Sequence, residues 1–241
     1  MNHVQGLLIT GTDTGVGKTY VTALLARHLV KSGLRVGVYK PVCSGAETDP
    51  AGHLTWPDVN SLADAVNQAY PLEMICPIRL KAPLAPPLAA ELEGIELTLS
   101  QLAAGIGAWR DRVDILLVEG VGGWLCPLTA HETIRDYAQI QGFPVLVVAK
   151  DQLGAINHTL LTLESIRNTG LPLLGVILNQ PSSEPEEIRS GNAAMIGRLG
   201  GVTDVWTLSC GEVNQLQDQK TLVSIERTLR SIAELGTASP N

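Results

Sequence analysis

Short apolar runs alternate along the chain with longer stretches in which apolar residues recur at helical spacing. The runs are four or five residues long, are mostly Val, Ile and Leu, and predict strands at Leu7–Thr10, Val36–Tyr39, Ile115–Val118, Val145–Ala149 and Leu174–Leu178. Polar alternation is nearly absent from them, which is typical of strands buried on both faces of a parallel sheet.

The stretches between these runs have the spacing of amphipathic helices. Helices are predicted at Lys18–Ser32, Val59–Asn67, Ser100–Arg110 (capped by Ser100), Thr133–Gln141, Asn157–Asn168 and Pro185–Leu199. A strand–helix order repeated this often predicts an α/β fold, a doubly wound and mostly parallel sheet with helices on both faces.

Two segments interrupt this order. Residues 46–57 are polar and rich in turn formers, so we expect a loop that reaches over the strand ends. Lys81–Pro87 contains three prolines, which predicts a rigid, partly buried connection rather than a helix. The chain has no internal repeat and no low-complexity linker, and its 241 residues are expected to form a single domain, 1–241.

Composition narrows the function classes. Hydrophobic residues make up 45% of the chain, enough for a large core, while aromatic residues make up only 4% and the formal net charge is -7. Nucleic-acid binding depends on clustered basic residues and often on aromatic stacking, so no nucleic-acid partner is expected.

The four cysteines are far apart in sequence, which predicts reduced, structural thiols rather than a zinc site or a disulfide framework. The first residues lack a basic segment, and the apolar run after them is broken by Gly11 and Asp13. We therefore expect no signal peptide, no membrane span and a cytoplasmic location.

A phosphate-binding loop is predicted at Gly11–Thr19, which follows an apolar strand and opens a helix. Gly15 and Gly17 allow the backbone N–H groups to approach phosphate oxygens, and the helix start adds its positive dipole. Lys18 can reach the outer phosphates, and the Thr19 hydroxyl is suited to ligate Mg²⁺. Five residues, instead of the usual four, separate Gly11 from the Gly-Lys-Thr sequence. A glycine-rich turn without function is the alternative, and the strand–loop–helix context argues against it.

A second candidate lies at the end of the strand Ile115–Val118, where Glu119 is followed by Gly120, Gly122 and Gly123. A carboxylate at the tip of a strand beside a phosphate loop suits a second protein ligand of Mg²⁺. An ordinary tight turn after a strand-end glutamate is the alternative.

A third candidate is Lys40, which follows the strand Val36–Tyr39. Ligands of open α/β sheets gather at the carboxyl ends of the strands, so Lys40 is expected to face the same crevice and stabilise a transferring phosphoryl group. A solvated lysine is the alternative. Ser44 can hydrogen-bond a substrate, although by itself it carries no specific signal.

Four segments, in order, resemble the dethiobiotin synthetase family: Gly11–Thr19, Tyr39–Gly45, Val118–Trp124 and Leu153–Thr159. The five-residue spacing of the phosphate loop and the Ala-Pro-Leu-Ala-Pro sequence at 82–86 are also similar to that family. The resemblance covers about the first 180 residues and implies a P-loop NTPase-like fold.

The resemblance implies a specific reaction. This family closes the ureido ring of the biotin precursor from 7,8-diaminononanoate, CO₂ and ATP, and releases ADP and phosphate. One amine captures CO₂ as a carbamate, ATP phosphorylates the carbamate, and the second amine attacks the mixed anhydride. Such chemistry requires positioning and charge neutralisation rather than an enzyme nucleophile.

The resemblance also assigns residues to roles. Lys18 and Lys40 are implied as catalytic residues, and Thr19, Asp58 and Glu119 as magnesium ligands; Asp58 has no signal of its own. Nucleotide contacts are implied for Thr14, Gly15, Val16, Gly17, Lys18, Thr19, Tyr20, Asp58, Glu119, Gly120, Val121, Gly122, Asn179 and Gln180. Substrate contacts are implied for Ser44, Gly122, Gly123, Gly154, Ala155, Ile156 and Asn157.

In this family the substrate carboxylate is received by the partner subunit of a homodimer, and the matching element here is the helix start at Gly154–Asn157. The chain departs from the family at two places. Some members carry Glu where this chain has Gly15, and Thr207–Glu212 is only a loose counterpart of the loop that closes the family's adenine pocket.

Two other classes share parts of this pattern. Dimeric ATPase switches of the ParA and MinD kind have the same expected fold, but they usually carry an additional lysine early in the loop, where this chain has Thr12, Asp13 and Thr14. Cobyrinic acid amidases need a glutamine-hydrolysing domain, for which the chain is too short.

Overall fold

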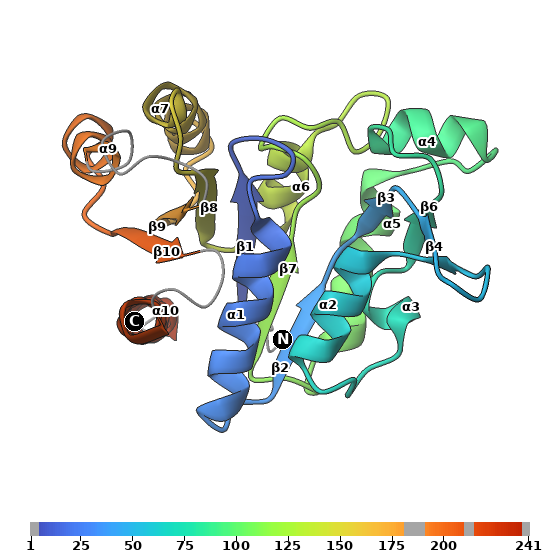
Figure 1. Cartoon of the computed structure of the whole chain (residues 1–241), viewed down its shortest axis with the longest axis horizontal. Helices are drawn as coiled ribbons and strands as arrows, with labels where there is room; N and C mark the ends of the chain where they lie inside the picture. Colours follow the sequence, from blue (N-terminus) through green and yellow to red (C-terminus); the bar gives the residue numbers. More distant parts are fainter. Residues whose placement is uncertain (1–4, 181–190, 210–214, 238–241) are drawn as a thin grey trace.

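The computed structural model of the chain describes residues 5–180, 191–209 and 215–237 (Figure 1). Within these residues, six parallel strands form the main sheet in the order β10-β9-β8-β1-β7-β2. Their bounds are β1 (Gly6–Gly11), β2 (Val36–Tyr39), β7 (Ile115–Glu119), β8 (Val145–Lys150), β9 (Leu173–Gln180) and β10 (Val205–Ser209). The phosphate loop that follows β1 therefore starts at the middle of the sheet.

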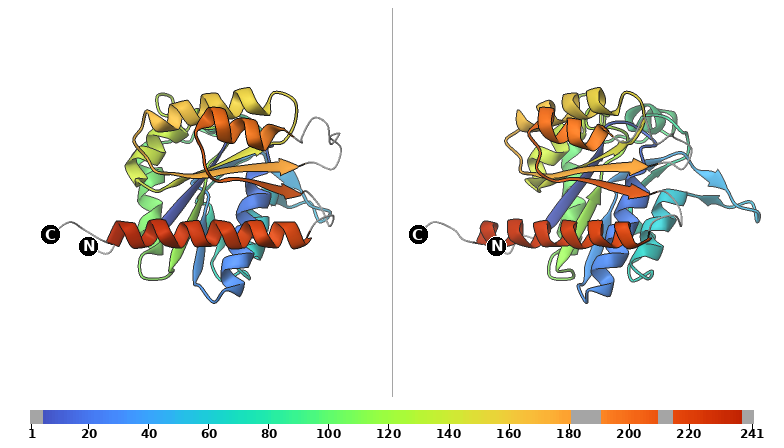
Figure 2. Two further views of the ribbon diagram at one scale, coloured as in Figure 1. Left: turned by 90° about the vertical axis from the view of Figure 1, so that its left-hand side faces the viewer. Right: turned by 60° about the vertical axis from the view of Figure 1, so that its left-hand side comes forward.

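Helices cover both faces of this sheet (Figure 2). On one side lie α7 (Ala155–Arg167) and α9 (Asn192–Gly200), and on the other lie α1 (Lys18–Lys31) and the long α10 (Gln215–Thr237). Two further helices are α2 (Pro57–Ala65), which packs on α1, and α6 (Ile134–Gln141). The predicted doubly wound α/β architecture is confirmed.

Smaller elements extend the fold beside β2. A parallel pair joins β3 (Val42–Ser44) to β6 (Ile78–Leu80), and an antiparallel hairpin joins β4 (Glu47–Thr48) to β5 (Leu54–Thr55). Short helices follow at α3 (Leu72–Ile75), α4 (Pro86–Leu92), α5 (Leu99–Ala104) and a 3-10 turn, η1 (Gly105–Trp109).

The five strands predicted from apolar runs all lie in the main sheet. All five residues of β7 are buried, and Leu7, Leu8 and Ile9 of β1 are fully buried. This agrees with strands that are covered on both faces. None of the described helices combines the length and the hydropathy needed to cross a membrane.

Several predicted boundaries were wrong. Pro86 and Pro87 are not part of a non-helical connection but occupy the first turn of α4, where the missing N–H groups would have no helical partner anyway. The helix expected from Ser100 begins at Leu99 and is capped by Thr98, whose side chain accepts from the Gln101 N–H at 3.3 Å.

Residues 46–57 are not simply a loop, because they contain the β4–β5 hairpin and the first residue of α2. The helix expected at Pro185–Leu199 is seen only from Asn192 onward, and residues 181–190 lie outside the described part of the chain.

The C-terminal helix α10 packs on β10 and is attached to α1 by a polar contact. The Glu226 carboxylate accepts from Arg230 at 2.7 Å and from Ser32 at 3.2 Å, and it pairs with His28 at 2.8 Å. The contact fixes α10 to the helix that follows the phosphate loop.

Candidate functional site

The phosphate loop leaves β1 at Gly11 and enters α1 at Lys18, which is the context that the sequence motif requires. Gly17 is the N-cap in the left-handed region, with a φ of 96°, and no side chain caps the helix. The Lys18 ammonium donates to the Asp13 carbonyl at 3.1 Å, which keeps the loop curled over the helix start. The uncapped N–H groups and the helix dipole form an anion site.

Asn179, at the end of β9, contacts the back of this loop. Its side-chain nitrogen donates to the Val16 carbonyl at 3.0 Å, and a Cβ at Gly17 would lie 2.0 Å from that nitrogen. The Asn179 Oδ1 atom is buried and has no hydrogen-bond partner among the described residues. A buried acceptor left open beside a phosphate loop is suited to a donor on a ligand.

A cluster of charged side chains, which we call the Lys40 cluster, consists of Thr19, Lys40, Asp58 and Glu119. The Lys40 ammonium lies 2.6 Å from Glu119 Oε1 and 2.5 Å from Asp58 Oδ2. The Thr19 hydroxyl donates to the same Glu119 oxygen at 2.7 Å. The structure therefore brings together four residues that come from α1, β7, the end of β2 and the start of α2.

Electrostatics in the cluster keep Lys40 charged. Burial by itself lowers the pKa of Lys40, but the Glu119 and Asp58 carboxylates outweigh it and raise that pKa. Burial likewise favours a higher pKa for Asp58, yet Lys40 and the Thr19 hydroxyl lower it below the usual value. Both side chains are therefore ionised at neutral pH.

Lys18 behaves differently. Burial is the main reason why its pKa is lowered, and the neighbouring Lys40 charge acts in the same direction. Glu119 and Asp58 oppose this shift but do not cancel it. In the ligand-free protein, Lys18 is a buried cation in an unfavourable place, which an anion next to the loop would relieve.

The cluster suits a hard cation. Glu119 Oε2 is buried and has no hydrogen-bond partner among the described residues, so one carboxylate oxygen is available to a ligand. No three His, Cys, Asp or Glu side chains gather into a complete metal cage anywhere in the described segments. Two carboxylates and a hydroxyl nevertheless match Mg²⁺, which takes its remaining ligands from water and substrate phosphates.

Asp58 was not found by reasoning from the residues alone. It lies in the first turn of α2, directly after Pro57 and the N-cap Trp56, whose indole N–H donates to the Leu80 carbonyl at 2.9 Å. The Pro-Asp pair after a polar segment is a helix-start signature that could have placed it on a helix N-terminus.

The loop after β7 lies along the phosphate loop. The Trp124 N–H donates to the Gly11 carbonyl at 3.0 Å, and its indole N–H donates to Ser165 of α7 at 3.0 Å. A pocket of about 380 Å³ opens between these elements. Its lining includes Thr14 and Gly123, so two predicted site residues share one concave surface.

The remaining predicted residues are less closely connected. Thr14–Tyr20 span the phosphate loop and the first turn of α1, and Gly120–Gly122 belong to the loop after β7. Gln180 donates to the Asp151 carboxylate at 3.0 Å. Ser44 is half-buried at the end of β3, and Gly154–Asn157 form the start of α7 with Gly154 as N-cap. No hydrogen bond or ion pair within the described residues joins Ser44 or this helix start to the Lys40 cluster. Of the segment Thr207–Glu212, residues 210–212 lie outside the described part.

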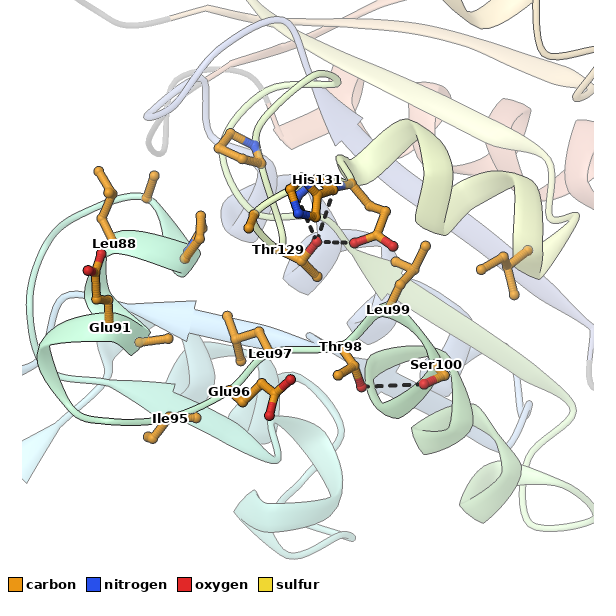
Figure 3. A pocket seen from close by; sticks show the side chains of 17 residues that line it. Leu88, Glu91, Ile95, Glu96, Leu97, Thr98, Leu99, Ser100, Thr129 and His131 are labelled. Carbon is orange, nitrogen blue, oxygen red and sulfur yellow. Dashed lines mark hydrogen bonds between the residues drawn. The ribbon is translucent and has the colours of Figure 1, made fainter.

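A separate groove of about 1070 Å³ lies between α4, residues 95–100 and the loop 127–132 (Figure 3). Apolar side chains such as Leu88 and Leu97 and the acidic Glu91 and Glu96 line it, and none of the predicted site residues does. Its size alone does not make it the site, because the anion loop and the charged cluster lie elsewhere.

Comparisons with known proteins show the family to which the chain belongs. The family described as an AAA domain matches residues 5–220. The ATP-dependent dethiobiotin synthetase BioD of Anaeromyxobacter dehalogenans strain 2CP-C is 44% identical over 196 residues, 81% of this chain and 86% of that protein. Proteins with the same description from Bacillus subtilis strain 168 (38%, covering 83% and 84%) and Nitrosospira multiformis (37%, covering 99% and 100%) are also similar.

Similar solved structures include pNOB8 ParA bound to nonspecific DNA, with a TM-score of 0.56 at 13% identity, covering 96% of this chain and 99% of that one. The cell division ATPase MinD of Pyrococcus furiosus has a TM-score of 0.55 at 17% identity, covering 95% and 99%. At these identities the likeness shows the fold alone.

Proposed function

Because the chain belongs to the ATP-dependent dethiobiotin synthetase family, we propose that it closes the ureido ring of dethiobiotin from 7,8-diaminononanoate and CO₂. It is an ATP-dependent ligase of biotin biosynthesis. The observation that carries the proposed chemistry is the Lys40 cluster, in which two carboxylates, a hydroxyl and a lysine lie beside the phosphate loop.

The reaction proceeds in three steps. One amine of the diamine adds to CO₂ and loses a proton, which gives a carbamate. A carbamate oxygen attacks the γ-phosphorus of ATP, and ADP leaves. The second amine then attacks the carbonyl carbon of the mixed anhydride, the ring closes, and phosphate departs. Each step develops or moves negative charge, so placed cations and N–H groups are the main catalytic need.

Lys40 and Lys18 supply those cations. Lys40 stays protonated because its two carboxylate neighbours raise its pKa, so it stabilises charge on the carbamate and the phosphoryl group rather than acting as a base. Lys18, at the first position of α1, reaches the outer phosphates together with the uncapped N–H groups of the helix start.

Thr19, Asp58 and Glu119 would hold Mg²⁺, which when bound neutralises the phosphate charge. The open Oε2 of Glu119 and the Thr19 hydroxyl support this assignment. Residues Thr14–Tyr20 and Gly120–Gly122 surround the phosphates. The open Oδ1 of Asn179 accepts from the amino group of the adenine base, next to Gln180.

For the diamine, we assign Ser44, Gly122 and Gly123 to the reacting end. The start of α7, Gly154–Asn157, receives the substrate carboxylate in the other subunit of a homodimer, because its N-cap Gly154 leaves the N–H groups of the helix start without a side-chain cap. The single domain and the cytoplasmic location remain predictions.

One assay tests the reaction. The protein is incubated with ATP, Mg²⁺, bicarbonate and 7,8-diaminononanoate, and ADP and dethiobiotin are both measured. ADP release should depend on the diamine and match the dethiobiotin formed. Lys18→Ala and Glu119→Ala should abolish turnover without unfolding the protein. Hydrolysis that ignores the diamine would instead favour the ATPase switch with which this fold is shared.

A subunit-mixing experiment tests the shared site. Lys40→Met and Gly154→Val chains should each be inactive alone, because one lacks the catalytic cation and the other lacks the left-handed N-cap, whose φ is 91°. Unfolded and refolded together, they should regain activity, since a mixed dimer contains one intact site. No regain, or a monomeric wild type in sedimentation analysis, would contradict the shared site.

A further inference from the structure

A buried carboxylate lies outside the Lys40 cluster. Asp151 directly follows β8 and is fully buried, and no lysine, arginine or histidine of the described segments forms an ion pair with it. Its two oxygens accept from side-chain amides instead: Oδ1 from Asn192 at 2.6 Å and Oδ2 from Gln180 at 3.0 Å. Burying a carboxyl group whose partners are only neutral amides is costly, so we expect a role that a smaller apolar residue could not fill.

Asp151 is attached to the end of β9 in two ways. Its backbone N–H donates to the Asn179 carbonyl at 2.9 Å, and its side chain holds the Gln180 amide. Asn192, its other partner, is buried at the first position of α9. One residue thus fixes the backbone of Asn179, the side chain of Gln180 and the start of the next helix.

The chemistry of the carboxylate also fixes which way the amides point. The NH₂ groups of Gln180 and Asn192 both face Asp151 and donate to its carboxylate oxygens, which act as acceptors. The carbonyl oxygen of half-buried Gln180 is then the atom left for other partners. The Asn179 nitrogen is likewise occupied by the Val16 carbonyl, which leaves its oxygen open. Asn179 and Gln180 therefore each have an amide oxygen, a hydrogen-bond acceptor, that is available to a ligand.

We propose that Asp151 is a positioning residue that sets the base preference of the nucleotide site. Asp151 fixes the end of β9 and orients the Gln180 amide so that its oxygen faces away from the carboxylate. This orientation favours a base with an amino group, as in ATP, over a base with a carbonyl at the same place, as in GTP. The inference rests on the proposed function, because it places the base at the end of β9.

Asp151→Asn tests it, since the variant keeps the shape but adds a donor that allows one amide to turn over. We expect the ratio of kcat/KM for ATP to that for GTP to fall about tenfold, the effect of one mispaired polar group. The KM for ATP should rise while kcat with saturating ATP stays within about twofold. A purely structural role would lower the activities with ATP and GTP alike.

Asp136→Asn is the matched control. Asp136 accepts from the Thr133 hydroxyl at 2.7 Å in the capping box of α6, so this variant also removes a structural carboxylate, but not one at β9. It should lower Tm and leave the ATP to GTP ratio unchanged. An unchanged ratio in Asp151→Asn, or an equal fall in Asp136→Asn, overturns the proposal.

If Asp151→Asn does not fold, Gln180→Leu provides the test. This variant removes one amide partner of Asp151 and leaves its carboxylate with Asn192. It should reproduce the loss of preference, and the double variant should lose no more than either single variant. Direct binding of fluorescent ATP and GTP analogues separates this inference from the reaction. If the wild type binds ATP but forms no dethiobiotin, the proposed function fails while the binding ratio still decides the role of Asp151.

Discussion

The ammonium of Lys40 lies 2.6 Å from Oε1 of Glu119, with 4% of the Lys40 side chain and none of the Glu119 side chain exposed. Asp58 Oδ2 lies 2.5 Å from the same ammonium. One cation thus balances two carboxylates next to the phosphate loop.

The first prediction concerns Lys40→Met, which leaves these carboxylates close together without a cation. Removing one partner of a buried ion pair costs about 3–5 kcal/mol, so the free energy of unfolding should fall by that amount. MgCl₂ should restore more stability to the variant than to the wild type, because the carboxylates are then free to bind the ion. Thermal melts with and without MgCl₂ measure both effects. Lys31→Met, at the exposed end of α1, is the control and should change neither.

The second prediction is that Lys18→Met abolishes turnover and yet raises the Tm of the ligand-free protein at pH 7 by a few degrees, about 2–4 °C per kcal/mol. Burial lowers the pKa of Lys18, so its charge is less stable in the folded than in the unfolded state. Between the lowered pKa and 10.5 the unfolded chain binds more protons, and wild-type stability therefore rises with pH. The advantage of the variant should shrink across this window. A variant that is less stable than the wild type at pH 7 would contradict the account.

The third prediction compares two glycines that share a left-handed backbone. Gly17 has a φ of 96° and Gly33, after the end of α1, has a φ of 84°. A methyl group at Gly33 would meet nothing within 4 Å, whereas at Gly17 it would collide with the Asn179 amide. Gly33→Ala should cost only the backbone strain, about 1 kcal/mol, and keep ATP binding.

Gly17→Ala should have the same backbone strain, and its methyl group should also displace Asn179 and the phosphate loop. We expect its affinity for ATP to fall at least tenfold by calorimetry. Equal affinities in the two variants would mean that the contact with Asn179 does not shape the site.

The fourth prediction concerns Glu226, which attaches α10 to α1. Burial favours a higher pKa for this carboxyl, but its hydrogen bonds with Arg230, His28 and Ser32 outweigh that effect and lower the pKa. A lowered pKa contributes stability above 4.5, the unfolded value, and the contribution is lost as pH falls through the folded value.

Glu226→Gln should therefore unfold at lower urea concentration than the wild type at pH 7, and the two midpoints should converge below pH 4.5. Because the ion pair is near the surface, we expect a difference of about 1 kcal/mol or less at pH 7. A difference that persists unchanged in acid would show that charge is not its source.

The sequence predicted most of the elements that have a strong local pattern. The five apolar strands were found because burial on both faces leaves continuous Val, Ile and Leu runs. The strand β10, at the sheet edge, was missed because Val-Trp-Thr-Leu-Ser at 205–209 contains two polar residues and gives no continuous apolar run. The prolines at 86 and 87 led to a wrong prediction of a non-helical segment. Proline is tolerated in the first turn of a helix but not in its interior, and the Pro-Pro pair alone does not show which position it occupies.

The same contrast holds for the site. Lys40 directly follows β2 and Glu119 ends β7, and the carboxyl ends of parallel strands meet at one edge, so their meeting could be expected. Asp58 is separated from Lys40 by the β4–β5 hairpin and arrives by packing of α2 on α1. No sequence pattern marks Asp151 as buried. An aspartate after a strand resembles an ordinary turn residue, and only the structure shows its amide partners.

The position of β1 between β7 and β8 has a further consequence. The Lys40 cluster lies on the β7 and β2 side of β1, and Asn179 and Gln180, which we propose to bind the base, lie at the end of β9 on the other side. The residues proposed to take part in bond formation and those proposed to select the nucleotide therefore lie on opposite sides of β1. With this layout, Asn179, Gln180 and Asp151 can change, and with them the preferred nucleotide, while Lys40, Asp58 and Glu119 stay the same.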